Sequence, residues 1–319
     1  MTERHPTVDH RLSDDESNVH YDWSAERKPA LTVAPGETVR FDCRDASNGE
    51  IGPKTTVEML RSLTFEGHPL TGPVAVEGAE PGDVLEVELL GFEERGHGFT
   101  YFYEGDAGKG LLPDAFDDPG LYVWEIDDGV AEFVDGIEVP VDPFPGCIGV
   151  APAADGVHAT TPPRRVGGNV DIKHLTAGST LYLPIEVETG LFSIGDCHAA
   201  QGDGEVCVTA IEAAMSVTAR LDLRRDMSIE EPQFRTTGPF TPTGVDEPMF
   251  ATTGIADDLM TASKKAVGQM IDHLHDERRL SRDEAYILCS VAVDLKINEV
   301  VDAPNWVVSA YLPESLFPG

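Results

Sequence analysis

The sequence is poor in positive charge, in aromatic residues and in long apolar runs. Its 23 Lys and Arg residues stand against 57 Asp and Glu residues, which gives a net charge of -34, and aromatic residues make up only 7%. Such an acidic surface repels nucleic-acid phosphates and anionic lipid headgroups, so neither nucleic acid nor a membrane is expected as a partner. No apolar run approaches the roughly 20 residues that a membrane-spanning helix needs, so we expect a soluble protein.

The sequence also lacks closely spaced pairs of cysteines. The five cysteines are an odd number, are widely scattered and form no CxxC pair; they are Cys43, Cys147, Cys197, Cys207 and Cys289. A zinc site built from thiolates is therefore not expected. We expect free thiols, no signal peptide and a cytoplasmic location.

The acidic residues are spread over the whole length of 319 residues, and Arg outnumbers Lys by 16 to 7. This composition is typical of proteins that work in concentrated salt, where screening shortens the Debye length to about 3 Å at ~1 M and weakens self-repulsion. We therefore predict a halophilic protein that unfolds in dilute buffer. The alternative explanation is a specific basic partner.

Short runs with a period of two dominate residues 31–145, and Pro and Gly separate them. Residues 74–90 predict a hairpin with a turn at residues 80–83, and residues 55–63 predict a short helix. Strands at this spacing favour a sandwich or a barrel-like arrangement. The expected fold class is mainly β, mixed with inserted helices.

A helical period is clear only near the C-terminus, over residues 255–279. Ser281 and Glu284 then match a capping box at the start of a second helix, and residues 306–312 predict a closing strand. We expect one domain over residues 1–319. Its residues 1–28 form either the first strand or a loosely held N-terminal arm.

Residues 190–212, GLFSIGDCHAAQGDGEVCVTAIE, combine glycines with oxygen ligands and an imidazole. A divalent metal site or a hydrolytic centre requires this mixture. Asp196 and His198 are two residues apart, so both side chains leave an extended segment on the same face and could hold one ion. Gly195, Gly202 and Gly204 allow the backbone to bend and to approach a small ligand.

Several motifs together resemble the acetamidase/formamidase family in order and spacing. They are LTGPVAVEGAEPGDVLEVEL, FPGCIGVAP, GGNVDIKHL, LYLPIEVETGLFSIGDCHAAQGDGEVCVTAIE and LSRDEAYILCSVAVDLKINEVVD, and the resemblance covers residues 33–312. It implies hydrolysis of the C–N bond of a small linear amide to a carboxylate and ammonia. It also implies zinc, calcium at a second site, and a homo-oligomer, either a dimer or a larger assembly.

Amide hydrolysis needs an activated water, stabilisation of the oxyanion and an acid for the leaving nitrogen. We predict that Asp45, Asp196 and His198 bind the metal, with Asp171 as a fourth ligand or an orienting partner. The further catalytic candidates are Glu205, as proton shuttle or ligand, and Asn169 and Gln201, which hold the substrate amide or the oxyanion.

Some of these residues also have a purely structural explanation. Asp45 follows a predicted strand and precedes Asn48 and Gly49, so it can equally serve as a turn residue. Glu205 can be a salt-bridged strand residue, and we expect Glu212, between apolar neighbours, to be structural or to support the site from outside.

Among the loop histidines only His68 is expected to line the cleft, and Cys147 is expected to be a buried, inert thiol. The alternative function is a non-catalytic β protein that binds a cation or a small ligand through the same segment.

Overall fold

The structure is a computed structural model and describes residues 7–105, 110–236, 248–300 and 303–317. The fold is mainly β, with three α-helices among the described residues. This confirms the fold class expected from the sequence. None of the helices in these parts of the chain is long and apolar enough to cross a membrane.

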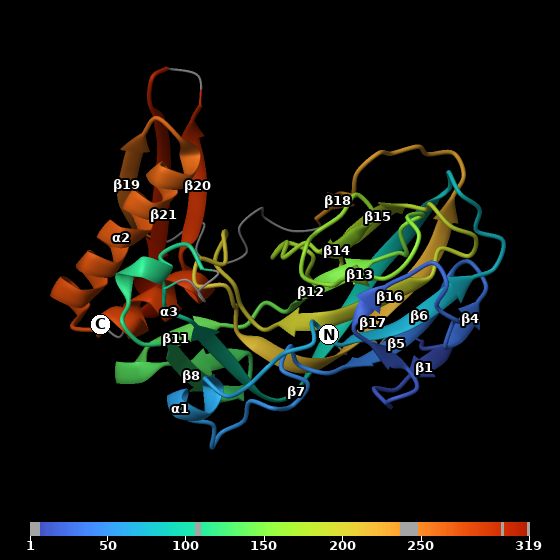
Figure 1. The fold of residues 1–319 in the computed structure, drawn as a ribbon, viewed down its shortest axis with the longest axis horizontal. Coiled ribbons are helices and arrows are strands. Elements are labelled where there is room, and N and C mark those ends of the chain that lie inside the picture. The colour runs from blue at the N-terminus through green and yellow to red at the C-terminus, as the bar shows by residue number, and fades with distance from the viewer. Residues whose placement is uncertain (1–6, 106–109, 237–247, 301–302, 318–319) are drawn as a thin grey trace.

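One large sheet of 13 strands forms the centre of the fold (Figure 1). Its main path runs in the order β14 (Gly167–Asn169), β12 (Phe144–Gly149), β16 (Phe192–His198), β17 (Glu212–Arg224), β7 (Val84–Phe102), β15 (Thr180–Pro184) and β18 (Gln233–Arg235). The other strands of this sheet are β1 (His10–Leu12), β2 (Val19–His20), β4 (Leu31–Val33), β5 (Glu37–Cys43), β6 (Leu70–Val76) and β8 (Gly120–Trp124). Every neighbouring pair on the main path is antiparallel.

Smaller sheets surround the large one. They are a three-stranded sheet of β9 (Ile126–Asp127), β10 (Val130–Glu132) and β11 (Glu138–Pro140), a pair of β3 (Asp22–Trp23) with β13 (His158–Ala159), and a C-terminal sheet of β19 (Met249–Ala256), β21 (Trp306–Pro313) and β20 (Asp294–Glu299). Figure 1 shows the C-terminal sheet on the opposite side of the molecule from β4 and β6. Short 3₁₀ turns span Pro113–Ala115, Val134–Gly136 and Glu314–Leu316.

The helices are α1 (Val57–Leu60), α2 (Leu259–Arg278) and α3 (Arg282–Ala292). The predicted capping box begins α3, because the Ser281 hydroxyl accepts from the Glu284 amide while the Glu284 carboxylate accepts from the Ser281 amide. Helix α2 starts later than predicted, because the residues before Asp258 extend β19. The closing strand β21 lies where the sequence predicts it.

The predicted hairpin at residues 74–90 is wrong in its pairing. Both strands exist, and the Asp83 amide donates to the Glu80 carbonyl in the expected turn. However, β6 pairs with β2, β4 and β16, whereas β7 pairs with β8, β15 and β17. The turn therefore separates two strands that belong to different parts of the large sheet.

Three short strands lie in the described part of the N-terminal segment. β1 pairs with β5, β2 pairs with β6, and β3 pairs with β13. Of the two alternatives for residues 1–28, this placement favours a first strand of the sheet.

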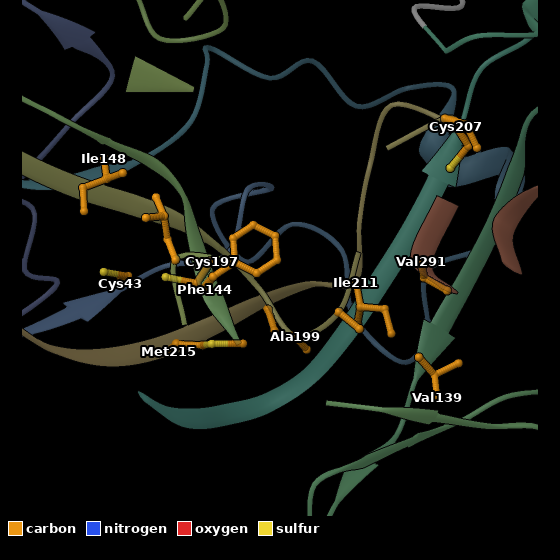
Figure 2. Close-up of a cluster of buried hydrophobic side chains, with 14 of the residues drawn as sticks. Cys43, Val139, Phe144, Ile148, Cys197, Ala199, Cys207, Ile211, Met215 and Val291 are labelled. Atoms are coloured by element: carbon orange, nitrogen blue, oxygen red, sulfur yellow. The ribbon is translucent and has the colours of Figure 1, made fainter. Parts of the chain in front are cut away.

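A continuous apolar core joins the large sheet to the C-terminal helices. Figure 2 shows part of it, where Phe144, Cys197 and Met215 lie near one another and Ile211 and Val291 lie on the side toward Val139. The five cysteines are all buried and free, as the sequence predicts. This core supports the strand ends at which the polar residues of the next section meet.

Candidate active site

Four carboxylates and one imidazole gather beside a single cavity. Their ligand atoms form two overlapping groups within 4.8 Å, one of Asp171, His198 and Glu205, the other of Asp196, His198 and Glu212. These five residues are called the acidic cluster below. Asp171, Asp196, Glu205 and Glu212 also line the cavity. The cluster has the composition of a hard-cation site that retains a nitrogen ligand.

The large sheet places the members of the cluster. Asp196 and His198 lie at the end of β16, as their spacing of two predicts. Glu212 begins β17 and stands opposite His198 in the antiparallel register. Asp171 follows β14, which reaches the same place because it pairs with β12, the neighbour of β16.

Two glycines make this convergence possible. A Cβ on Gly146 of β12 would lie 2.8 Å from Asp171 Oδ1 and 2.8 Å from His198 Cε1, so any side chain would displace the cluster. A Cβ on Gly195 would lie 2.2 Å from the Pro69 carbonyl oxygen, which is far inside van der Waals contact. Both positions therefore require the close backbone approach that only glycine permits.

Backbone strain is concentrated in the same place. Asp171, Asp196 and Glu205 have positive φ values of 46°, 52° and 41°, and the β-branched Val208 has 86°. Residues other than glycine rarely adopt this backbone conformation, because it costs about 1–3 kcal/mol at each position. Such strain persists where the surrounding fold over-determines it, which is typical of functional sites.

His198 is held in one orientation. Its Nδ1 lies 2.9 Å from Gln201 Oε1, and the Gln201 amide nitrogen donates to the Asp171 carbonyl at 2.9 Å. Because the amide oxygen can only accept, Nδ1 carries the proton and Nε2 faces the carboxylates. Nε2 lies 3.3 Å from Glu212 Oε2 and 3.8 Å from Asp196 Oδ1. An imidazole held in this way is typical of a metal ligand supported by a second residue.

Two carboxylate oxygens of the cluster are buried without a hydrogen-bond partner, Asp171 Oδ1 and Glu212 Oε2. The other oxygens of these groups are bonded, since Asp171 Oδ2 accepts from Asn169 at 2.9 Å and Glu212 Oε1 accepts from the Ala210 amide at 3.0 Å. Buried polar atoms normally find a partner, so this pair needs an explanation. A divalent cation bound by the cluster would supply such a partner.

Burial would raise the pKa of Asp196, but the imidazoles of His68 and His198 outweigh burial and lower it below the usual range. Burial also acts against the charged form of His198. The negative charges of Glu212 and Asp196 reverse this effect and raise the pKa of His198 well above its usual value.

The other carboxylates are shifted in the opposite direction. Burial, aided by the charges of Asp196 and Glu212, raises the pKa of Asp171 to about 7. Burial also raises the pKa of Glu205 well above its usual value, with the charge of Asp171 adding to it, and it raises that of Glu212. The raised pKa values favour the protonated forms of these three carboxylates. Protons thus reduce the negative charge that a bound cation would otherwise balance.

Helix α3 holds the loop that carries Gln201 and Glu205. The buried Ser290 hydroxyl accepts from the Cys207 amide at 3.0 Å and donates to the Thr209 carbonyl at 2.8 Å. The Ser290 carbonyl accepts from the Gly202 amide at 2.8 Å. The helix therefore fixes both ends of the loop.

Asp45 lies elsewhere, and the structure does not bring it into the cluster. Its Oδ1 accepts from the Ser47 amide at 2.9 Å, from the Ser47 hydroxyl and from the Gly49 amide at 3.1 Å. The carboxylate therefore closes its own turn after β5, which is the alternative explanation for this residue. We omit Asp45 from the metal ligands considered below.

Gln201 and Asn169 also differ from the roles expected of them. Both polar atoms of the Gln201 side chain are used by His198 and Asp171, which makes it a positioning residue instead of a substrate contact. Asn169 lines the cavity, but its amide nitrogen donates to Asp171 and its oxygen accepts from the Cys147 thiol at 3.0 Å. Both residues orient the cluster from outside.

His68 lines the cavity, as expected, and its Nε2 lies 3.9 Å from Asp196 Oδ2. Cys147 is buried, and burial raises the pKa of its thiol well above the usual value, in keeping with an inert role. Together with Asp196 these residues form a third group of ligand atoms. The thiol therefore lies closer to the site than the sequence indicates.

Glu212 is the member of the cluster that the sequence analysis assigned to a supporting role. Its apolar neighbours are buried, as expected, but its own side chain is 3% exposed and faces His198. The signal that could have identified it is the pairing of β16 with β17, which places the two residues opposite each other.

Comparison with known proteins identifies the family of this chain. A profile of the Acetamidase/Formamidase family matches residues 7–159 and 153–318. A formamidase from Methylophilus methylotrophus is 28% identical over 97% of this chain and 92% of its own length. An acetamidase from Mycolicibacterium smegmatis is 28% identical over 77% of this chain and 75% of its own length.

Solved structures share the whole fold. A gamma lactamase from Delftia acidovorans superposes with a TM-score of 0.90 at 27% identity, covering 97% of this chain and 94% of its own. An acetamidase from Bacillus halodurans gives a TM-score of 0.67 at 30% identity, covering 95% of this chain and 97% of its own.

Fold, cluster and relatives together define a hydrolase that cleaves amides. The chain belongs to the Acetamidase/Formamidase family, as its sequence motifs indicate.

Proposed function

We propose that this protein hydrolyses the C–N bond of a primary, linear amide to a carboxylate and ammonia. The observation that carries the proposal is the pair of buried oxygens without a hydrogen-bond partner, Asp171 Oδ1 and Glu212 Oε2, of which Glu212 Oε2 lies 3.3 Å from His198 Nε2. The formamidase and acetamidase relatives support this class of substrate.

The same residues fit a divalent ion, and we propose zinc. Asp196, His198 and Glu212 would hold it, because their ligand atoms, one imidazole nitrogen and two carboxylate oxygens, lie within 4.8 Å of one another, and Asp171 lies within the same distance of His198 in a second group. A bound divalent ion supplies a water of lowered pKa and polarises the substrate carbonyl. Calcium at a second site, as the resemblance implies, has no separate support among the described residues.

Glu205 is the proposed proton shuttle. Burial and the charge of the neighbouring Asp171 raise the pKa of Glu205, which favours its protonated form, and in this role Glu205 would donate the proton to the leaving nitrogen. Water adds its oxygen to the carbonyl carbon, the C–N bond breaks, and the transferred proton leaves on ammonia. Gln201 and Asn169 keep His198 and Asp171 in place while this occurs.

A second candidate is ring opening of a cyclic amide. The observation that favours it is the TM-score of 0.90 to the gamma lactamase from Delftia acidovorans. The same acidic cluster would act on the ring amide, and the released amine would remain attached to the product.

The test is metal analysis of protein purified in high salt, followed by product assays. Formamide, acetamide and a five-membered lactam are assayed before and after chelation and after zinc is restored. We expect ammonia release that chelation abolishes and zinc restores. A fully metal-loaded protein that cleaves none of the amides would overturn the enzyme proposal and favour a cation-binding protein.

A further inference from the structure

The cavity above the acidic cluster is larger than formamide or acetamide requires. Its volume is about 470 Å³, and pockets of roughly 300–1,000 Å³ typically enclose ligands of drug size. The acidic cluster forms only one side of this space. The side formed by the remaining lining residues therefore indicates what else the substrate carries.

Three aromatic rings make up that side, and we call Phe65, Tyr101 and Tyr103 the aromatic wall. Phe65 stacks on Tyr101 with centroids 5.8 Å apart and planes 24° apart, and Tyr103 meets Tyr101 edge-on at 5.3 Å. Leu63 extends the wall beside Phe65. These separations fall in the range of favourable aromatic pairs, and a further flat ring could add to the series.

The wall is fixed in place before any ligand binds. Phe99 is buried behind it and stacks on Tyr101 at 6.2 Å. The Tyr103 hydroxyl donates to the Leu60 carbonyl at 3.1 Å, and the Thr209 hydroxyl donates to the Tyr101 carbonyl at 2.8 Å. A preformed apolar surface loses little entropy when a ligand covers it.

The same lining disfavours an anionic substituent. Arg61, which lines the cavity, already pairs with Glu104 at 3.1 Å and with Asp118 at 2.7 Å. The acidic cluster and Glu66 add negative charge to the lining. An anionic group on the substrate would meet repulsion without a free counter-charge, so the substituent carries no negative charge.

We propose that the aromatic wall is an acyl-binding site and that the substrates are primary amides with a flat aromatic acyl group that carries no negative charge. The inference rests on the proposed function, because a reaction that releases ammonia leaves no substituent on the nitrogen. The additional volume must then accommodate the acyl group. The wall and the acidic cluster line one cavity, so the ring and the amide can occupy it together.

The experiment compares kcat/KM for acetamide, benzamide and 2-phenylacetamide with the zinc-loaded protein. We expect an aromatic amide to exceed acetamide by at least about tenfold, which is the lower limit for additional apolar contact in a fitted pocket. A fall in kcat/KM from acetamide to both aromatic amides would overturn the inference and leave the proposed function intact. No turnover of any amide by metal-loaded protein would overturn the proposed function, and the inference with it.

Substitutions at Phe65 test whether a preference for aromatic amides depends on the aromatic wall. Phe65→Ala is expected to lower the ratio of aromatic to acetamide kcat/KM by about tenfold, and Phe65→Leu, which keeps apolar volume, by less. The matched control is Phe234→Ala, since Phe234 is 39% exposed on β18, outside this cavity. An unchanged ratio in folded Phe65→Ala and Phe65→Leu proteins, or an equal loss in the Phe234→Ala control, would contradict the assignment.

Discussion

The turn after β5 and the end of β16 look alike in sequence but differ in how their polar groups are satisfied. Each carries an aspartate near the end of a strand and close to positive-φ residues. In the first, Asp45 Oδ1 accepts three hydrogen bonds from its own turn. In the second, Asp196 lies among His198 and the other carboxylates of the acidic cluster, in which Asp171 Oδ1 and Glu212 Oε2 have no hydrogen-bond partner.

The difference shows what distinguishes a ligand site from a turn. Local backbone donors satisfy the carboxylate of a turn aspartate, so the turn needs no bound ion. The acidic cluster is incomplete by itself, and the strain at Asp171, Asp196 and Glu205 is maintained by distant parts of the sheet and by α3. Four variants test this comparison.

His198→Ala is expected to have the largest effect, because it removes the nitrogen around which the four carboxylates lie. We expect loss of bound metal and amide turnover below detection, measured by metal analysis and ammonia release. Circular dichroism in high salt is the control for folding. A folded variant that keeps its metal and its turnover would show that the cluster is not the active site.

Glu205→Gln should lower kcat by about 10²–10⁴-fold, the usual contribution of a positioned acid or base. The amide has a similar shape but cannot supply the proton. Metal content measured beside kcat separates the two roles considered for Glu205, since a shuttle variant keeps the metal and a ligand variant loses it. Unchanged kcat would exclude both.

Gln201→Ala should weaken metal binding by about 10–100-fold, the typical effect of removing a residue that orients a ligand histidine. The reason is that His198 Nδ1 loses its acceptor and the Asp171 carbonyl loses its donor. Zinc titration against a competing chelator gives the change in affinity. If instead KM for the amide rises while zinc affinity stays the same, Gln201 contacts the substrate, as the sequence first suggested.

Asp45→Ala should have the smallest effect on activity and a measurable one on stability. Removal of the acceptor leaves the Ser47 and Gly49 amides without their partner, which costs about 1–3 kcal/mol of the free energy of unfolding. Denaturant unfolding in high salt measures this loss, and ammonia release should stay within about twofold of the parent. A large loss of zinc affinity would return Asp45 to the ligand set.

The parts of the site that sequence reasoning found depend on local spacing. Asp196 and His198 are two residues apart on a strand, and the glycines beside them are visible in the sequence. Glu212 was given too little weight, because its role follows from the register of β16 against β17, which is a contact between segments. Asp45 was given too much, because a carboxylate after a strand looks the same whether or not its own turn satisfies it.

The same limit applies to the fold. Strand periodicity and the capping box at Ser281 are local, and the structure has both. The pairing of β6 and β7 with different partners depends on which strands meet in the sheet, and alternation in one segment does not contain that information. The predictions of salt-dependent stability and of a homo-oligomer concern the surface and stay predictions.

The attachment of the loop to α3 has a consequence for local unfolding. The Gly202 and Cys207 amides donate to the carbonyl and hydroxyl of Ser290, a fully buried residue of the helix. The loop cannot open without breaking bonds to the helix, so loop and helix should exchange their amide hydrogens as one cooperative unit. In most enzymes a loop bearing the reacting groups belongs to the least protected part of the chain, whereas here it should be among the slowest to exchange.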